Sequence, residues 1–310
     1  MKKTFLLALG LGLAGGVHAT TWQPTPGHKQ VPIWPGVAPH ELPVSGPEFA
    51  RGNVIERVSR PTLTLYRPKG RNTGAAIVVY PGGGFWILAM DLEGTEVCDW
   101  LTAKGIACVL VKYRVPGAHL YPRSGPYPDN PVATEDAQRA IALTRFHAPQ
   151  WGIDPHRIGV LGFSAGGYLV AATSTLGRIY KPVDAIDQVS ARPDFGIALY
   201  PGHLWLDDES KLELNPDVPV DAHTPPQFIV QNEDDPVDSI NNSLVYYTAL
   251  KKAGVPTEMH LYAKGGHAFG LRHDPAKPAS NWPKLAERWM RTIGILGPVR
   301  HAQDRGVLRP

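Results

Sequence analysis

A serine between two glycines stands where an apolar run meets a helix-compatible run. The stretch GVLGFSAGGYLVAA, residues 159–172, contains the pattern G-x-S-x-G around Ser164. Between a strand and a helix this pattern is typical of a nucleophile elbow, a sharp turn that displays a serine hydroxyl. The two glycines avoid collisions with the strand and the helix, and the N-terminus of the helix favours negative charge at the serine. The pattern predicts that Ser164 is a nucleophile; a structural serine in a tight turn is the alternative.

A serine hydroxyl is a poor nucleophile without a base, and one histidine is well placed to be that base. His267 is one of 12 histidines and lies in AKGGHAFG, a glycine-rich loop after a predicted strand. Earlier in the chain, FIVQNEDDPVD places Asp234 and Asp235 just past another predicted strand. The order serine, acid, histidine is that of a hydrolytic triad in which the acid orients the imidazole. We therefore predict a triad of Ser164, one of these aspartates and His267; helix capping is the alternative role of the aspartates.

A glycine run supplies the backbone that such a site would need. YPGGGFW, residues 80–86, follows an early predicted strand, upstream of Ser164. Backbone N–H groups can approach a tetrahedral intermediate only where side chains are absent. We predict that the amides of Gly83 and Gly84, together with that of Ala165, form an oxyanion hole. A plain loop is the alternative for the glycine run.

Strand-like and helix-like segments alternate from Pro61 onward and would position these residues. Strands are predicted over 62–68, 75–83, 106–114, 156–163, 194–201, 227–232 and 257–263, and helices over 92–104, 133–148, 165–176, 239–253 and 282–294. This alternation predicts an α/β fold with a doubly wound, mostly parallel sheet flanked by helices. Two proline-rich loops, 115–133 and 201–225, are candidate walls of a site beyond the carboxyl ends of the strands.

The N-terminus has the features of a secretory signal peptide. Two lysines precede a short, glycine-rich apolar run, and Val17-His18-Ala19 resembles a cleavage site. Removal of residues 1–19 would leave a single α/β domain over 20–310, which begins with an irregular arm that could include an edge strand. The protein would then be secreted or periplasmic, without contact to a membrane after cleavage. An uncleaved membrane anchor is the alternative.

The composition indicates a globular protein and gives no sign of a nucleic acid partner or a metal site. Hydrophobic residues make up 43% and charged residues 19% of the 310, as in a globular chain with a large core. Cleavage would remove two lysines from a chain of net charge +3, so nothing indicates a nucleic acid partner. Cys98 and Cys108 have apolar neighbours and are predicted to be buried thiols, with a disulfide as the alternative in an exported protein. His267 and His273 lack convergent carboxylates, so neither a metal nor another cofactor is predicted.

Six ordered motifs carry a family resemblance. PGGGF, VKYRVP, DAQRAI, WGIDPHRIGVLGFSAGGYL, DDPV and YAKGGHAFGL together resemble the α/β-hydrolase esterases. They are most similar to the secreted carbohydrate esterases, which include acetylxylan-esterase-like and bifunctional acetyl/feruloyl esterases. The resemblance covers roughly residues 30–295. Asp235, which precedes Pro236, resembles the acid of many hydrolase loops, so Asp235 is the predicted triad acid and Asp234 the alternative.

The resemblance implies a secreted serine carboxylesterase that deacylates, above all deacetylates, carbohydrate substrates through an acyl-enzyme on Ser164. Aromatic residues near the predicted site could stack on sugars, or else anchor the core and loops: Phe85, Trp86, Tyr121, Tyr127 and Trp205. Of these, Phe85, Trp86 and Trp205 are the predicted substrate-binding residues. Arg114 and Asp136 match positions that look structural in such esterases, and we assign them to a scaffold pair.

Three other functions share parts of this pattern. A general short-chain esterase would use the same residues. A serine peptidase of the prolyl-oligopeptidase kind shares the elbow and the triad order, but only about 40 residues precede the first predicted strand, too few for the gating domain of such peptidases. An inactive binding module with this fold would have lost a triad member, whereas every member is present. The sequence specifies no oligomeric state.

Overall fold

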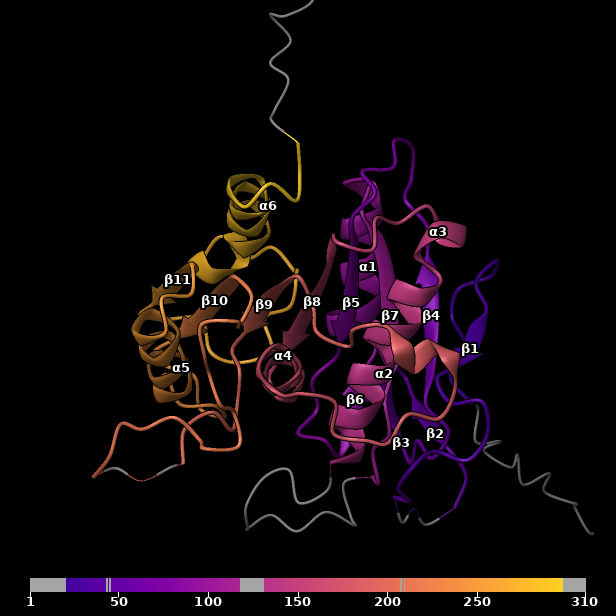
Figure 1. Ribbon diagram of the computed structural model, residues 1–310. Coiled ribbons are helices and arrows are strands. Elements are labelled where there is room, and N and C mark those ends of the chain that lie inside the picture. Colours follow the sequence, from indigo (N-terminus) through magenta and orange to yellow (C-terminus); the bar gives the residue numbers. More distant parts are fainter. Residues whose placement is uncertain are drawn as a thin grey trace, which may run out of the picture.

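The computed structural model describes residues 21–42, 44, 46–117, 131–206, 208 and 210–297. It consists of a broad twisted sheet with helices packed against it (Figure 1). The predicted signal peptide at 1–19 lies outside the described residues, as do Tyr121, Tyr127 and most of the predicted loop 115–133.

The main sheet has eight strands in the order β1-β4-β7-β5-β8-β9-β10-β11. Their bounds are Gln30–Pro32 (β1), Thr62–Tyr66 (β4), Ala76–Tyr80 (β5), Ala107–Lys112 (β7), Ile158–Phe163 (β8), Phe195–Leu199 (β9), Gln227–Asn232 (β10) and Thr257–Tyr262 (β11). The pairs of β4 with β1 and with β7 are antiparallel, and all pairs from β7 to β11 are parallel. The seven strands predicted from the sequence are therefore confirmed, and β1 is an edge strand in the N-terminal arm.

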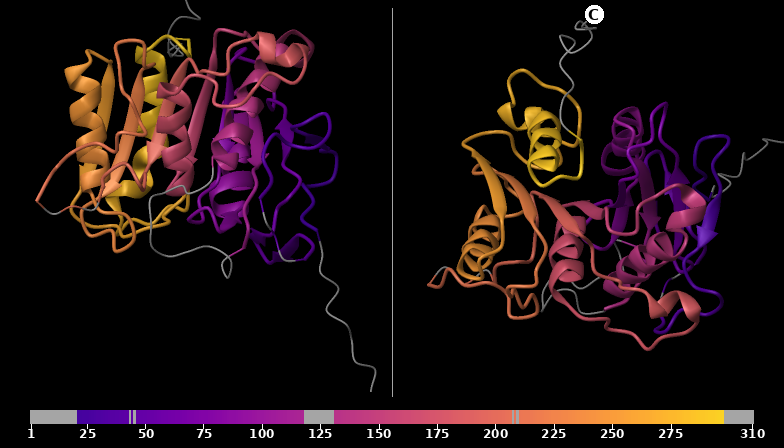
Figure 2. Two further views of the ribbon diagram at one scale, coloured as in Figure 1. Left: turned by 60° about the horizontal axis from the view of Figure 1, so that its bottom comes forward. Right: turned by 45° about the horizontal axis from the view of Figure 1, so that its top comes forward.

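Helices cover both faces of this sheet. Two lie on one face, α1 (Glu96–Ala103) and α6 (Trp282–Thr292), and three on the other, α2 (Val132–Phe146), α4 (Ala165–Thr175) and α5 (Asn241–Lys252) (Figures 1 and 2). Because the helices exclude water from both faces, every residue of β5, β7, β8, β9 and β10 is buried. The doubly wound, mostly parallel architecture predicted from the alternation of segments is confirmed.

A small second sheet supports the glycine run. It consists of β2 (Phe49–Arg51), β3 (Val54–Glu56) and β6 (Ile87–Ala89), in that order. β6 follows the glycines and leads into a π-helical turn, η1 (Asp91–Thr95), which continues as α1. These strands were not predicted, because three residues are too few to show a period of two.

The two cysteines form a disulfide, so the prediction of two buried thiols was wrong. Cys98 in α1 and Cys108 in β7 are bonded, and their Cα atoms lie 5.2 Å apart. α1 packs directly on β7, the strand that follows it. This contact brings two residues ten positions apart into the range of a disulfide. Apolar neighbours in the sequence indicated burial of each residue, but not that the two side chains face each other.

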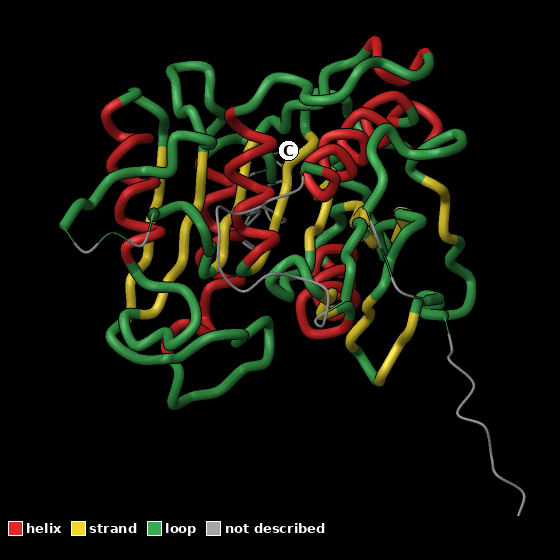
Figure 3. The backbone as a smooth tube through the Cα atoms, turned by 90° about the horizontal axis from the view of Figure 1, so that it is seen from below, coloured by secondary structure: helices red, strands yellow, loops and turns green. Residues whose placement is uncertain are grey.

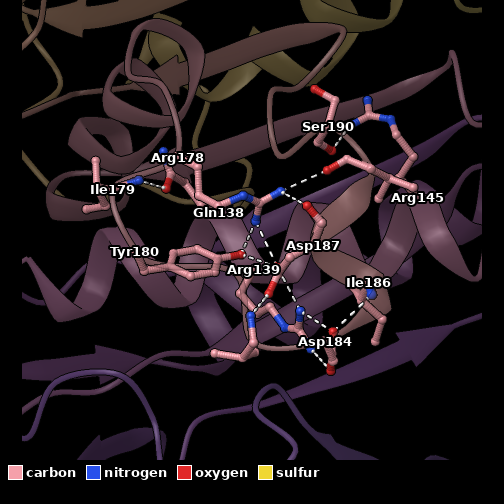
Figure 4. Close-up of polar contacts among 12 residues, drawn as sticks. Gln138, Arg139, Arg145, Arg178, Ile179, Tyr180, Asp184, Ile186, Asp187 and Ser190 are labelled. Atoms are coloured by element: carbon pink, nitrogen blue, oxygen red, sulfur yellow. Dashed lines mark hydrogen bonds and ion pairs between the residues drawn. The ribbon is translucent and has the colours of Figure 1, made fainter.

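A buried ion-pair network fastens α2 to the segment that follows α4 (Figure 4). The Arg139 guanidinium is 1% exposed and pairs with Asp184 at 2.6 Å and Asp187 at 2.7 Å. Asp187 also accepts hydrogen bonds of 2.8 Å from Arg178 and from the hydroxyl of Tyr180. Because a buried charge is tolerated only when it is paired, the network fixes α2, which in turn packs against α4.

The predicted scaffold pair forms between β7 and α2. The Nε of Arg114, just after β7, donates to Oδ2 of Asp136 at 2.9 Å. The indole N–H of Trp34, from the N-terminal arm, donates to the same carboxylate at 2.7 Å. All three side chains are buried. The pair therefore ties the arm, the sheet and a helix together.

Candidate active site

The predicted site residues lie in loops at the carboxyl ends of neighbouring strands. The strands β5, β8, β9, β10 and β11 are consecutive in the sheet and parallel, so the loops that leave their carboxyl ends meet at one edge. Figure 3 shows the strands between helices, with loops gathered at the strand ends. Ser164 follows β8, Asp235 follows β10 and His267 follows β11.

Ser164 occupies a sharp strand-to-helix turn. Its backbone has φ 51° and ψ −118°, between the end of β8 and the first residue of α4. A Cβ at Gly162 would collide with the carbonyl oxygen of Gly166, and a Cβ at Gly166 with that of Tyr80. The two glycines are therefore required for the turn that places the serine at the end of the sheet.

His267 is held by Asp235 rather than by Asp234. The imidazole Nδ1 lies 2.7 Å from Oδ2 of Asp235, whose side chain is completely buried. The other oxygen of Asp235 accepts the amides of Val237 and Asp238 at 2.9 and 3.0 Å, which fixes the carboxylate. Asp234 instead accepts two amides of the histidine loop and shapes that loop.

A third carboxylate, Asp238, lies between the serine and the histidine. Ser164 Oγ lies 3.0 Å from Oδ2 of Asp238, and the same oxygen is 3.8 Å from Nε2 of His267. An ionised carboxylate only accepts hydrogen bonds, so the serine hydroxyl donates. Asp238 was not among the site residues predicted from the sequence. Its position three residues after Asp235, in the same turn, is the signal that could have identified it.

The backbone amides predicted to form an oxyanion hole are available. Within the described residues, no acceptor pairs with the amides of Gly83, Gly84 or Ala165. The amide of Gly82 is different, since it donates to Oε2 of Glu93 at 2.7 Å. In the glycine run, the free amides of Gly83 and Gly84 therefore follow the amide of Gly82, which is anchored by Glu93. Glu93 is a buried residue at this edge that sequence reasoning did not select.

Backbone strain concentrates around these loops. Of six described residues other than glycine with positive φ, five follow the carboxyl ends of β5, β8, β9 and β11: Phe85, Ser164, Tyr200, His203 and Ala268. Such conformations are unfavourable and persist where the surrounding structure imposes them, above all at functional sites. The strain independently supports this edge as the active site.

The predicted substrate-binding aromatic residues differ in their surroundings. Phe85 is 3% exposed and packs against Tyr113 and Tyr168, with ring centroids 5.9 and 6.1 Å away. Trp205 is 6% exposed, and its indole N–H donates to the carbonyl oxygen of Lys211 at 2.8 Å. These two side chains occupy the positions of core and loop anchors, whereas Trp86 is only half-buried.

The segment 201–225 is attached to the body of the protein near its start. The side-chain oxygen of Asn242, in α5, accepts the amides of Leu204 and Trp205 at 2.8 and 2.9 Å. Leu206 and Leu212 are exposed, at 55% and 58%. The start of the loop is thus held to α5, and the exposed apolar side chains that follow it are isolated ones.

The charges around His267 favour its protonated form. Burial lowers the pKa of the imidazole, but the hydrogen bond and charge of Asp235, with the charges of Asp238 and Glu93, outweigh burial and hold the pKa above its ordinary value of 6.5. An imidazole with a raised pKa is a stronger base. It must, however, be neutral to accept a proton.

We therefore expect kcat/KM to fall as the pH drops through the raised pKa of His267, with a midpoint above 6.5. Above this pKa the base is neutral and activity is complete, and below it the imidazolium cannot accept the serine proton. The measurement is kcat/KM for a short-chain ester from about pH 5 to about pH 9. A midpoint below the ordinary value would contradict the electrostatic assignment.

The described residues show neither a cluster of metal ligands nor a helix that could span a membrane. In the part of the chain that the structure describes, no group of three histidine, cysteine, aspartate or glutamate side chains could hold a metal ion. In the same residues, no helix combines the length and apolar character needed to cross a bilayer.

Known proteins share this arrangement of strands and loops. The BD-FAE family model matches residues 63–199, and that of the prolyl oligopeptidase family matches residues 132–282. A solved structure of an acetyl ester-xyloside bifunctional hydrolase from Caldicellulosiruptor lactoaceticus is 32% identical in sequence, covers 87% of this chain and 97% of its own, and has a TM-score of 0.68. The chain belongs to the α/β-hydrolase family.

Curated relatives of the α/β hydrolase are longer proteins. It is 29% identical over 243 residues to an acetylxylan esterase of Xylanibacter ruminicola. The aligned region covers 72% of this chain and 45% of that protein. It is 26% identical over 231 residues to endo-1,4-beta-xylanase B of Butyrivibrio fibrisolvens, and this aligned region covers 69% of this chain and 35% of that protein. The hydrolase therefore spans less than half the length of these two relatives. The family and fold class predicted from the motifs are confirmed.

Proposed function

We propose that this hydrolase is an exported serine carboxylesterase that deacetylates carbohydrate substrates through an acyl-enzyme on Ser164. The observation that carries the proposal is the 2.7 Å contact of His267 with the buried Asp235, beside a serine held in a strained elbow. A histidine oriented by an acid is the base that a serine nucleophile requires. The proposal includes removal of residues 1–19 and a single catalytic domain over 20–310.

Acylation follows from these positions. On binding of an ester, the Ser164 hydroxyl turns from Asp238 to Nε2 of His267, which accepts its proton as Oγ attacks the carbonyl carbon. The negative charge moves to the carbonyl oxygen, where the amides of Gly83, Gly84 and Ala165 donate hydrogen bonds. Asp235 holds the imidazole in the tautomer that exposes Nε2 and stabilises the imidazolium.

Proton transfer from the imidazolium completes acylation, and deacylation then uses the same groups with water as the nucleophile. The imidazolium of His267 gives its proton to the departing alcohol oxygen as the bond from carbon to that oxygen breaks, which leaves an acyl group on Ser164. A water molecule then attacks the acyl carbon and passes a proton to Nε2. Collapse of the second tetrahedral intermediate releases the carboxylic acid and returns the proton to the serine oxygen.

The substrate class rests on the relatives and on the loops. The names of the relatives include acetylxylan esterase and acetyl ester-xyloside hydrolase, which supports acetylated sugars. The segment 201–225 interleaves leucines with acidic residues, whereas a lid for long acyl chains would present a broad apolar face. We infer a small acyl pocket.

The rate is therefore expected to be highest for acetate and to fall as the acyl chain lengthens. Forcing extra methylene groups into a small pocket costs roughly 1–3 kcal/mol, which lowers the rate about ten- to hundredfold. The measurement is kcat/KM for nitrophenyl esters from acetate to palmitate. A maximum at octanoate or a longer chain would move the enzyme towards the lipases.

A serine peptidase is the second candidate, because the prolyl oligopeptidase family model matches residues 132–282. Comparing acetylated xylan, methyl ferulate and nitrophenyl acetate with a proline-containing aminoacyl substrate separates the two functions. Faster release of the aminoacyl group would favour the peptidase.

A further inference from the structure

A buried carboxylate outside the predicted triad links the glycine run to the histidine. Glu93 lies in η1, the π-helical turn before α1, and is 3% exposed. π-Helical turns within α-helices are frequent at functional sites. A buried carboxylate is costly unless several partners hold it, so its contacts indicate what it does.

Both oxygens of Glu93 accept hydrogen bonds from residues at the site. Oε2 accepts the amide of Gly82 at 2.7 Å, and Oε1 accepts the hydroxyl of Tyr200 at 2.8 Å. The amide of Gly270 donates to the Tyr200 oxygen at 3.3 Å, which directs the tyrosine proton towards Glu93. Burial raises the pKa of the Glu93 carboxyl above its ordinary value, whereas these two hydrogen bonds and the charge of His267 act in the opposite direction and favour the ionised form.

Close approach of this carboxylate depends on a glycine. A Cβ at Gly82 would lie 2.6 Å from Oε2 of Glu93 and 2.7 Å from the carbonyl oxygen of Phe163. Gly82 directly precedes the two glycines whose amides are predicted to stabilise the oxyanion. Glu93 therefore anchors the oxyanion loop by its first amide.

Tyr200 carries the connection to the catalytic histidine. It follows β9 with φ 37°, an unfavourable backbone conformation for tyrosine. Its ring packs edge-on against the imidazole of His267, with centroids 4.8 Å apart and planes at 65°. The ring of Phe269, two residues after His267 in the same loop, also packs edge-on against the Tyr200 ring, with centroids 4.4 Å apart.

We propose that Glu93, acting through Gly82 and Tyr200, is a positioning residue that fixes the oxyanion loop against His267 and stabilises the imidazolium by its charge. The proposal rests on the serine esterase function proposed above. The groups in contact with the imidazole are Asp235 and Asp238 from the loop after β10 and the neutral Tyr200 from the end of β9, and the charge of Glu93 from η1 acts on it from behind Tyr200.

The first test is Glu93→Gln, which retains shape and an acceptor for Gly82 but removes the charge. We expect kcat to fall about ten- to hundredfold, while KM stays within about twofold, because the ground-state contacts remain. Loss of a nearby negative charge should also move the acid limb of the kcat/KM profile to lower pH. Titration of the His267 imidazole by NMR in the absence of substrate should show the same displacement.

The second variant, Tyr200→Phe, separates the positioning effect of the Tyr200 hydrogen bond from the effect of the Glu93 charge. It leaves the Glu93 carboxylate in place but removes its second hydrogen bond, so kcat should fall while the acid limb moves less than in Glu93→Gln. The matched control is Tyr246→Phe in α5, which removes a buried hydroxyl that has no hydrogen-bond partner among the described residues. This control should behave as the wild type.

The outcomes distinguish this inference from the function on which it rests. If Ser164→Ala keeps the wild-type rate, the proposed serine esterase function fails. If Ser164→Ala is inactive but Glu93→Gln has a wild-type rate, acid limb and histidine titration, the role of Glu93 alone is overturned. Should Glu93→Gln not fold, an unchanged kcat in Tyr200→Phe overturns it equally.

Discussion

Replacing Ser164 with alanine is expected to lower the rate of ester hydrolysis by a factor of ~10⁴ to 10⁶. Without the hydroxyl, no acyl-enzyme can form, and only the oxyanion amides and substrate binding still favour the transition state. Among the described residues, the serine oxygen makes one side-chain hydrogen bond, to Asp238, so the fold should persist. The measurement is hydrolysis of nitrophenyl acetate by the purified variant.

The control for this variant is its thermal unfolding, which should resemble that of the wild type. Retention of more than a few per cent of the wild-type rate by a folded Ser164→Ala protein would exclude Ser164 as the nucleophile. A trace of wild-type contamination is distinguished by titrating active sites with an organophosphate, because the variant has no hydroxyl to modify.

Replacing Asp235 with asparagine should lower turnover by roughly 10⁴. The amide would hold His267 in the wrong tautomer, with its proton on Nε2 directed at the serine, and the imidazolium would lose its closest negative charge. The pair of hydrogen bonds from Val237 and Asp238 to the other oxygen can remain, so the loop should keep its shape. The measurement is kcat at a pH where the wild type is fully active.

Asp234→Asn is the matched control, since it makes the same chemical change one residue earlier. The side-chain oxygen of asparagine can still accept the amides of Gly265 and Gly266, each at 2.8 Å in the wild type. We expect less than about a tenfold loss of turnover. The reverse order of effects would make Asp234 the triad acid.

The fold could be predicted because its strands are long and apolar. A run such as IVV in β5 or CVLV in β7 is buried on both faces, and only a parallel sheet covered by helices accommodates several runs of this kind. The turn that holds Ser164 was equally visible, because its glycines are required by the turn itself. By contrast, β6 has three residues and no pattern, so this strand after the glycine run could not be assigned.

The carboxylates at the site were harder to predict. Asp238 and Glu93 are acidic residues in a loop and in a helical turn, where most such side chains face solvent. What distinguishes them is burial beside His267, which depends on strands far apart in the sequence. The sequence indicated a choice between Asp234 and Asp235 but did not show that the charges of three carboxylates act on one imidazole.

Because of the Cys98–Cys108 disulfide, the stability of the protein depends on the redox conditions of the compartment in which it folds. A covalent link between residues ten positions apart removes chain entropy from the unfolded state, equivalent to about 3 kcal/mol of stability in the loop-closure treatment. This is a sizeable fraction of the total for a typical domain. In a reducing cytoplasm the same polypeptide would hold α1 on β7 by packing alone, and α1 continues directly from the turn that carries Glu93. An oxidising compartment therefore secures the helix behind the oxyanion loop as well as the chain as a whole.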